Sequence, residues 1–280
     1  MPFRAPILAA LLMGAALATP VLAQTALPAA TPAPTPGAHL TAAVNAPNRT
    51  PANKERDRWR NPAQTLAFFG LQPGMTVVEI GPGAGWYTEI LAPAVGPRGK
   101  LVLGGPDPAA SERAAQAVQA IKTRLAANPA YANTSVGVFT KGSYDVVPAG
   151  TADMVVTFRN VHNWMAADFA QEAFNGFYQA LKPGGVLGVV EHRLPESREQ
   201  DPKAASGYVK ESEVIRMAQA AGFVLEARSD VNANPRDTAD HEGGVWALPP
   251  ILRHGDTNRD RYVAIGESDR MTLRFRKPMR

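Results

Sequence analysis

Apolar residues occur along this chain in two patterns, as short continuous runs and as stretches in which they recur every three or four positions. Continuous runs are typical of strands buried on both faces of a parallel sheet, and the helical spacing predicts amphipathic helices. The predicted strands are residues 76–80, 100–103, 135–140, 153–158, 186–191, 223–227 and 271–276. The predicted helices are residues 63–69, 87–95, 114–125, 169–181 and 211–221.

Strands and helices therefore alternate, which predicts an α/β fold. We expect a doubly wound, Rossmann-like sheet of about seven strands, mostly parallel with an antiparallel last strand. Residues 271–276 alternate apolar and charged side chains, as an antiparallel strand with one solvated face does. The predicted domain covers residues 53–280, with an insertion around 232–269 that is too long for an ordinary loop.

The N-terminal residues have a different pattern. Arg4, an apolar run over residues 7–18 and small residues up to Ala23 predict a signal peptide over residues 1–23. The run is short for a membrane span, so we expect no stable membrane insertion after signal cleavage, with an uncleaved anchor as the alternative. Residues 24–52 are rich in Ala, Pro and Thr and are predicted to be a disordered linker. These features predict an exported, periplasmic protein.

Composition narrows the possible chemistry. The chain has no cysteine, which excludes disulfides, thiolate zinc sites and a cysteine nucleophile. Its formal net charge of +4 is too small to indicate a nucleic-acid partner, and none is expected. The sequence gives no indication of the oligomeric state.

A glycine-rich turn follows the first predicted strand. Glu79, Gly81, Gly83 and Gly85 stand at alternate positions, where glycine lets a ligand approach the backbone closely. A dinucleotide fingerprint needs a third glycine at the sixth position of the turn, and that position is Trp86. The acid and three alternating glycines resemble motif I of the class I S-adenosylmethionine (SAM)-dependent methyltransferases.

Two further segments carry the same resemblance, which extends over about residues 56–278. Residues 181–185 resemble the turn before the fifth strand of these enzymes, and residues 153–164 resemble their fourth strand and the active-site segment after it. With the signal peptide, the chain is similar to a little-characterised group of exported bacterial predicted methyltransferases. The resemblance implies SAM as the cofactor and methyl transfer to a small-molecule acceptor.

The resemblance also implies which residues bind the cofactor. The glycine turn would receive its methionine and ribose parts, Glu79 its ammonium group, and Ser143 and Tyr144 its adenine. The acid that usually ends the second strand is missing near Gly105, and Asp107 is its candidate substitute. The implied cofactor-binding residues are Glu79, Gly81, Gly83, Gly85, Asp107, Ser143, Tyr144 and Arg159.

Candidate catalytic residues follow the fourth predicted strand, because ligands of such sheets bind outside the carboxyl ends of the strands. His162 is the first candidate for a general base, with Asn160 and Asn163 orienting the acceptor. A structural role of His162 in the loop is the alternative, and His192 after the fifth strand is the second candidate base. Arg56, Asp57 and Arg60 form either a lid over the cofactor or a solvated helix face.

Residues 237–242 together with His162 or His192 offer nitrogen and oxygen ligands for a metal. A charged cluster of this kind is more typical of a solvated loop, so no metal site is predicted. Two other functions stay open. One is a binding or scaffold protein that kept the fold without catalysis. The missing acid near Gly105 and a doubtful SAM supply after export support this alternative. The third alternative, an NAD-type oxidoreductase, is disfavoured by Trp86.

Overall fold

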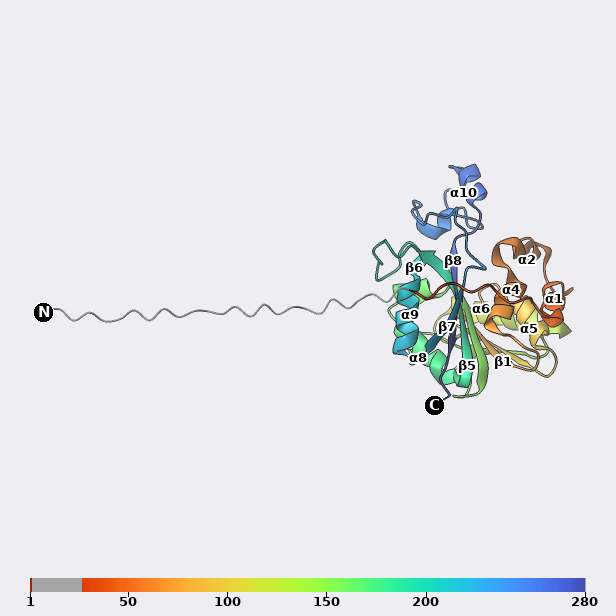
Figure 1. The fold of residues 1–280 in the computed structure, drawn as a ribbon. Helices are drawn as coiled ribbons and strands as arrows, with labels where there is room; N and C mark the ends of the chain where they lie inside the picture. Colours follow the sequence, from red (N-terminus) through yellow and green to blue (C-terminus); the bar gives the residue numbers. More distant parts are fainter. Residues whose placement is uncertain (2–26, 280) are drawn as a thin grey trace.

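The computed structural model describes residue 1 and residues 27–279 (Figure 1). The predicted signal peptide, apart from Met1, lies outside the described residues. No helix in the described part of the chain is both long enough and apolar enough to span a membrane.

The described residues form one twisted sheet in the order β3-β2-β1-β4-β5-β8-β7. The strands from β3 to β5 are parallel, and β8 runs antiparallel between β5 and β7. A short eighth strand, β6, pairs with the end of β5. The strands are β1 Thr76–Ile80, β2 Lys100–Gly105, β3 Thr134–Val138, β4 Ala152–Phe158, β5 Leu181–Leu194, β6 Val209–Lys210, β7 Val224–Ser229 and β8 Arg270–Arg276. The predicted Rossmann-like fold with an antiparallel last strand is confirmed.

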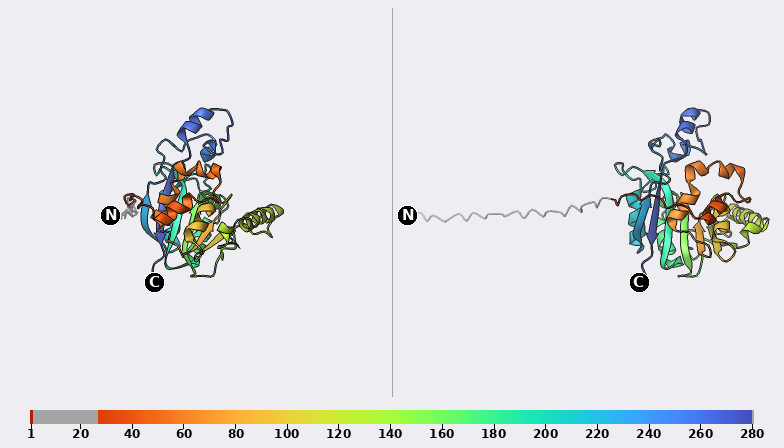
Figure 2. Two further views of the ribbon diagram at one scale, coloured as in Figure 1. Left: turned by 90° about the vertical axis from the view of Figure 1, so that its right-hand side faces the viewer. Right: turned by 45° about the vertical axis from the view of Figure 1, so that its right-hand side comes forward.

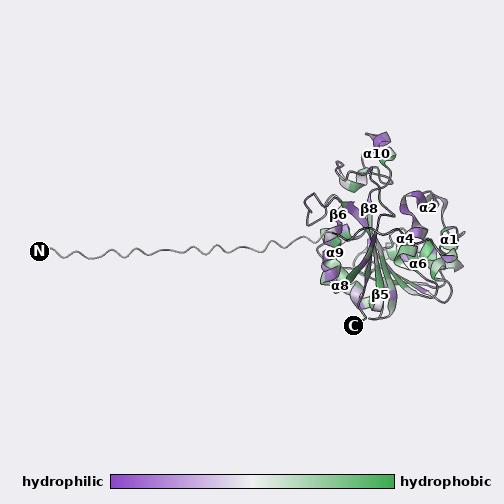
Figure 3. Ribbon diagram, in the orientation of Figure 1, coloured by the Kyte–Doolittle hydropathy of each residue, from purple (hydrophilic) through white to green (hydrophobic). Residues whose placement is uncertain are grey.

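Consecutive residues of the central strands enter two separate hydrophobic cores. Val77 of β1 packs into one core and Val78 into the other, because side chains alternate between the faces of a strand. In β4, Met154 and Val156 share the core of Val77, while Val155 shares that of Val78. The strands are accordingly almost uniformly apolar, as Figure 3 shows for the centre of the sheet.

Helices cover both faces of the sheet (Figures 1 and 2). One side carries α1, α4 and α5, and the other carries α8 and α9. Helix α6 lies beside β3 at the edge of the sheet and buries only Val118. The helices are α1 Ala38–Val44, α2 Pro51–Lys54, α3 Asp57–Arg60, α4 Pro62–Phe69, α5 Thr88–Val95, α6 Glu112–Ala126, α7 Val161–Ala166, α8 Ala170–Ala180, α9 Glu211–Ala220 and α10 Arg259–Ile265, with 3-10 turns at η1 Pro129–Tyr131 and η2 Gly244–Ala247.

The structure differs from the predicted linker over residues 24–52. Helix α1 lies within that segment and buries Leu40 and Ala43 in the core formed with α4 and α5. A seven-residue helix with only two buried apolar residues shows too little periodicity to be recognised in a sequence. Short helices of this kind depend on tertiary packing rather than on intrinsic propensity.

The insertion joins β7 to β8 and includes η2 and α10. It stands beyond one end of the sheet, together with β6 and α2 (Figure 1). One small apolar cluster joins Val245 of the insertion to Tyr208 just before β6, and another packs Leu248 against Tyr262 within the insertion. The insertion is therefore a packed substructure, and it provides one wall of the cavity described next.

Candidate active site

A cavity of about 370 Å³ lies at the carboxyl ends of β1, β4 and β5. Its walls come from the glycine turn, from the segment around α2 and α3, and from the insertion at residues 245–251. Six of the residues predicted for the site line it, namely Glu79, Gly81, Gly83, Arg159, Asn160 and His162. The topology thus brings the turn after β1 and the segment after β4 to one place, as expected for an open α/β sheet.

The glycine turn is shaped for close contact with a ligand. Gly81 and Gly83 both have positive φ angles, 65° and 55°, which glycine adopts without steric cost. A Cβ atom at Gly81 would come within 2.8 Å of the Asn160 amide. A Cβ at Gly83 would meet no atom within 4 Å, so the backbone there faces open space in the cavity.

Asn160 fastens the end of β4 to this turn. Its Nδ2 donates to the carbonyl oxygens of Ile80 at 3.0 Å and Gly81 at 3.2 Å, and it lies 3.1 Å from Thr157 Oγ1. These contacts occupy the amide nitrogen and fix the position of the glycine turn.

Glu79 is buried at the end of β1. Thr88, the first residue of α5, donates its hydroxyl to the Glu79 carboxylate at 2.6 Å. Burial raises the pKa of Glu79 to about 7, against the opposing effects of the Thr88 hydrogen bond and the Arg124 charge. The carboxyl group therefore changes its charge near neutral pH.

His162 and Glu191 form a buried hydrogen-bonded pair beside the turn. His162 Nδ1 lies 3.0 Å from Glu191 Oε1, and the same carboxylate accepts the backbone N–H groups of His162 at 3.3 Å and His192 at 2.8 Å. An acceptor-only carboxylate fixes the imidazole with its proton on Nδ1 and leaves Nε2 as a proton acceptor. Burial lowers the pKa of His162, but attraction and hydrogen bonding to Glu191 outweigh it and raise the pKa overall.

His192 has the opposite electrostatic environment. Its ring centre lies 5.4 Å from that of His162, and its Nδ1 is 2.6 Å from Ser268 Oγ. Burial holds the pKa of His192 well below its usual value, and the nearby charges of His162, Arg159 and Arg270 lower it further. Two neighbouring histidines thus have pKa values shifted in opposite directions, which is a feature of acid–base sites.

His162, Glu191 and His192 also offer ligand atoms within 4.8 Å of one another, a spacing that fits a metal ion. Two features oppose this use. His162 Nδ1 is engaged with the carboxylate itself, and the positive charges of Arg159, Arg270 and Arg60 act on His192. The group is therefore better described as a hydrogen-bonded histidine–carboxylate pair beside a histidine with a lowered pKa.

Arginines and one glutamate form the wall next to α3. Glu267 pairs with Arg56 at 2.7 Å, with Arg60 at 3.1 Å and with Arg270 at 3.2 Å. Arg60 is buried, and Arg56, Arg60 and Glu267 line the cavity. The arginines of the predicted lid therefore face the site, whereas Asp57 pairs with Arg49 behind it.

Trp86, the residue that breaks the dinucleotide fingerprint, has a structural role. Its indole N–H donates to the Asn53 carbonyl at 3.0 Å, and the guanidinium groups of Arg60 and Arg49 lie 4.6 and 5.1 Å from the ring centre. The next residue, Tyr87, stacks on Phe158 with ring centres 3.4 Å apart. The aromatic pair thereby joins the N-terminal helices to the glycine turn.

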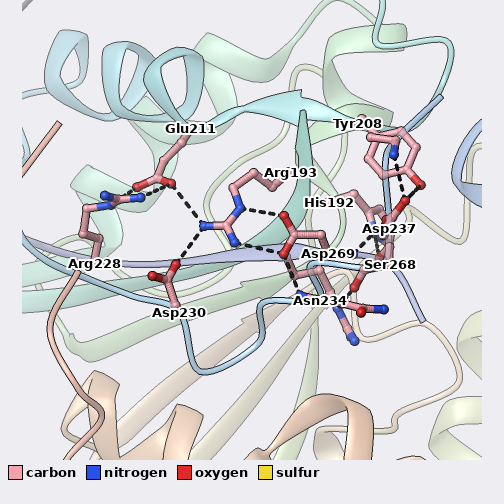
Figure 4. A network of polar contacts seen from close by, with 12 residues as sticks. His192, Arg193, Tyr208, Glu211, Arg228, Asp230, Asn234, Asp237, Ser268 and Asp269 are labelled. Atoms are coloured by element: carbon pink, nitrogen blue, oxygen red, sulfur yellow. Dashed lines mark hydrogen bonds and ion pairs between the residues drawn. The ribbon is translucent and has the colours of Figure 1, made fainter. Parts of the chain in front are cut away.

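A polar network supports the histidine side of the cavity (Figure 4). Arg193 donates to both carboxylate oxygens of Asp269 at 2.8 and 2.9 Å and to Asp230 at 2.9 Å. Asp237 accepts the Tyr208 hydroxyl at 3.0 Å and the Asp269 backbone N–H at 2.8 Å. These bonds fix the segment that carries Ser268, the hydrogen-bonding partner of His192.

Five predicted residues do not line the cavity: Gly85, Asp107, Ser143, Tyr144 and Asn163. Asp107 accepts the backbone N–H of Ala109 at 2.8 Å within its own loop. Tyr144 packs against Phe139, and the Asn163 side chain is exposed. Arg124 from α6 lies over the turn and donates to the Ala84 carbonyl, close to Gly85. The cofactor-binding roles of the first four residues and the acceptor-orienting role of Asn163 stay predictions.

Comparison with known proteins agrees with this geometry. Residues 78–187 match a family model described as a methyltransferase domain. No curated protein matches the chain significantly in sequence.

Three solved structures are similar in fold. A SAM-dependent methyltransferase from Aquifex aeolicus is 18% identical with a TM-score of 0.52, over 80% of this chain and 93% of that chain. The [4+2]-cyclase SpnF is 17% identical with a TM-score of 0.53, over 82% of each chain. The methyltransferase CalH, in complex with S-adenosylhomocysteine (SAH), is 17% identical with a TM-score of 0.51, over 81% of this chain and 59% of that chain. These structures share the predicted Rossmann-like fold, and residues 78–187 of this chain are similar to a methyltransferase domain.

Proposed function

We propose that this protein transfers the methyl group of SAM to a small-molecule acceptor, with His162 as general base. The observation that carries the proposal is the His162–Glu191 pair, which opens onto the same cavity as the glycine turn. SAM is the cofactor of the class that motif I resembles, and the CalH structure contains its demethylated product.

The residues present fit this cofactor. The backbone at Gly83 faces open space, and Gly81 and Glu79 lie beside it on the cavity wall. These residues would hold the cofactor against the turn, and Trp86 and Tyr87 would close the cavity beside it. When bound, SAM supplies an electrophilic methyl group.

The remaining chemistry belongs to the side chains. A hydroxyl acceptor would have to lose its proton as it is methylated, so positioning the acceptor and removing its proton would be the work of the protein's own residues. Nε2 of His162 takes this proton, while Glu191 holds Nδ1 and stabilises the imidazolium that forms.

The test is binding followed by turnover. Titration calorimetry of the purified protein with SAM and SAH measures cofactor affinity, and transfer of labelled methyl to a panel of hydroxylated small molecules measures activity. His162→Ala should lower turnover about a hundredfold and change the SAM dissociation constant little. No heat with millimolar SAM would remove the basis of the proposal, and equal turnover of variant and parent would exclude His162 as the base.

A second candidate is a protein with this fold that does not transfer methyl groups. It is favoured by the end of β2, where Gly105 stands in place of an acid and the Asp107 carboxylate is engaged with Ala109. The structure of SpnF, which has a similar fold, is named as that of a [4+2]-cyclase. The same calorimetry separates the candidates, because binding of SAM without any turnover supports the second.

We also propose that the protein is exported to the periplasm, as in the bacterial group it resembles. The support is the pattern of Arg4, the apolar residues 7–18 and the small residues before Gln24. N-terminal sequencing of protein from the periplasmic fraction should begin near Gln24. An intact Met1 in the membrane fraction would indicate an anchor instead.

A further inference from the structure

The arginine wall of the cavity holds more positive charge than the protein itself neutralises. Arg56, Arg60 and Arg270 share the single carboxylate of Glu267. Arg159 also lines the cavity and is not among the ion-pair partners of Glu267. The Glu267 carboxylate is ionised at neutral pH, because attraction to its arginine partners outweighs burial and lowers its pKa to about 2. Four guanidinium groups, three of them on residues that line the cavity, therefore lie near the one carboxylate of Glu267.

Arg60 is the best-defined member of this wall. Only 1% of its surface is exposed, and both of its terminal nitrogens, Nη1 and Nη2, are buried without a hydrogen-bond partner. Nη2 of Arg56 is buried and without a partner as well. Unpaired buried guanidinium nitrogens are costly, and planar guanidinium groups bind carboxylate and phosphate in bidentate geometry. Arg56 and Arg60 both belong to the residues that line the cavity, which indicates that a ligand entering it supplies the missing acceptors.

The cofactor does not supply enough negative charge. SAM carries one carboxylate but also an ammonium and a sulfonium group, so its entry adds net positive charge to the cavity. Among the described residues that line the cavity, the other carboxyl group is that of Glu79, whose pKa of about 7 leaves it partly neutral. The positive charge of the cavity therefore favours an acceptor that carries an anionic group.

Arg159 connects the arginine wall to the proposed base. Its charge lowers the pKa of Arg60 on one side and opposes protonation of His162 and His192 on the other. An anionic group held between Arg60 and Arg159 would therefore place the rest of a small acceptor beside His162. Within the proposed function, we infer that Arg60 and Arg159 bind a carboxylate or phosphate group of the methyl acceptor.

The test uses matched probes on the purified protein. Calorimetry measures binding of 4-hydroxybenzoate, its neutral analogue 4-hydroxybenzamide and inorganic phosphate, each with and without saturating SAH. The parent should bind an anionic probe at least tenfold more tightly than the amide, with SAH present. Tighter binding of phosphate than of the benzoate would indicate a phosphorylated acceptor, and the reverse a carboxylic acid.

Variants tie the binding to the two arginines. Arg60→Met should weaken binding of the anion about tenfold or more, and Arg159→Met, which breaks no Glu267 ion pair, should do the same. Arg58→Met on the same helix is the control and should bind as the parent does, because Arg58 is exposed and outside the cavity lining.

Three results would overturn the inference. The first is equal binding of 4-hydroxybenzoate and 4-hydroxybenzamide, and the second is unchanged anion binding in both Arg60→Met and Arg159→Met. The third is loss of anion binding when SAH is present, which would assign the arginines to the cofactor's carboxylate. All three leave the proposed function intact if SAM binds and methyl transfer is observed. Anion binding without any SAM binding would instead refute the proposed function while keeping the anion site.

Discussion

Replacing the buried Arg60 with methionine should stabilise the ligand-free protein. Arg60 is charged in a site where Nη1 and Nη2 have no partner. Burial and the repulsion of Arg159 lower its pKa from 12.5 to about 8. At about 1.4 kcal/mol per pKa unit, this corresponds to about 6 kcal/mol of destabilisation of the charged form at pH 7.

Removing the Arg60 side chain relieves this destabilisation but also removes a favourable contact. Methionine gives up the contact of the guanidinium with the Trp86 ring, which lies 4.6 Å away and contributes about 1 kcal/mol. Glu267 keeps Arg56 and Arg270 as partners. Replacement of buried ionic groups by apolar ones of similar volume stabilises by about 1–4 kcal/mol. We therefore expect a gain of about 2 kcal/mol, or about 4–8 °C in Tm.

Calorimetric melting at pH 7, in low salt without phosphate or sulfate, measures this difference. Arg49→Met is the matched control, since Arg49 also lies over Trp86 but forms a two-bond ion pair with Asp57 at 2.6 and 2.8 Å. Removing Arg49 leaves Asp57 unpaired and should lower the free energy of unfolding by about 1–3 kcal/mol. Opposite signs are thus expected for two arginines on one aromatic ring.

The pH dependence gives a further check. Above pH 8 the folded protein releases the Arg60 proton while the unfolded chain keeps it, so the stability of the parent rises with pH. The advantage of Arg60→Met should therefore shrink as pH rises through about 8. A lower Tm for Arg60→Met than for the parent at pH 7 would refute the reasoning.

Glu191→Gln removes the charge that raises the pKa of His162. The proposed base acts as the neutral imidazole, so the acid limb of the rate profile should move to lower pH, with a reduced plateau. An unmoved limb would contradict the role of the pair. Gly83→Val should abolish SAM binding in calorimetry, because a branched side chain enters the cavity. It should also lower the free energy of unfolding by about 1–2 kcal/mol, because valine is strained at a φ of 55°. Retained SAM affinity would exclude the turn as the binding site. Gly188→Ala should destabilise the protein by about 1–3 kcal/mol in denaturant titration without changing SAM affinity, because its Cβ would lie 2.6 Å from the Phe69 ring.

Most of the sheet was predictable from the sequence because each central strand is buried on both faces. The prediction for β1 matches the structure over residues 76–80, and the other long strands differ mainly at their ends. The short helices α2, α3 and α7 were not predicted, since their formation depends on contacts with distant residues. Strand β5 extends beyond its predicted end at Glu191 because β8 and β6 continue to pair with it.

The candidate site was predictable only in part. Glycines and residues after a strand carry a local signal, and the turn and His162 were found in this way. Glu191 gave only a weak signal, a single acid at the end of an apolar strand, and its partner His162 is distant in sequence. The ion pairs of Glu267 with Arg56 and Arg60 span more than two hundred positions, so no local pattern could predict them. Nothing in the sequence indicated that Asn160 would fasten the glycine turn.

The contacts of Arg193 give the insertion a fixed base. One guanidinium binds Asp230, which follows β7, and Asp269, which precedes β8. The two ends of the segment are thereby held together much as a disulfide would hold them, in a chain that has no cysteine. Closing a loop in this way costs little more entropy as the loop grows longer. The interior of the insertion can therefore accept additions and deletions that reshape its wall of the cavity, while Ser268 and His192 keep their positions.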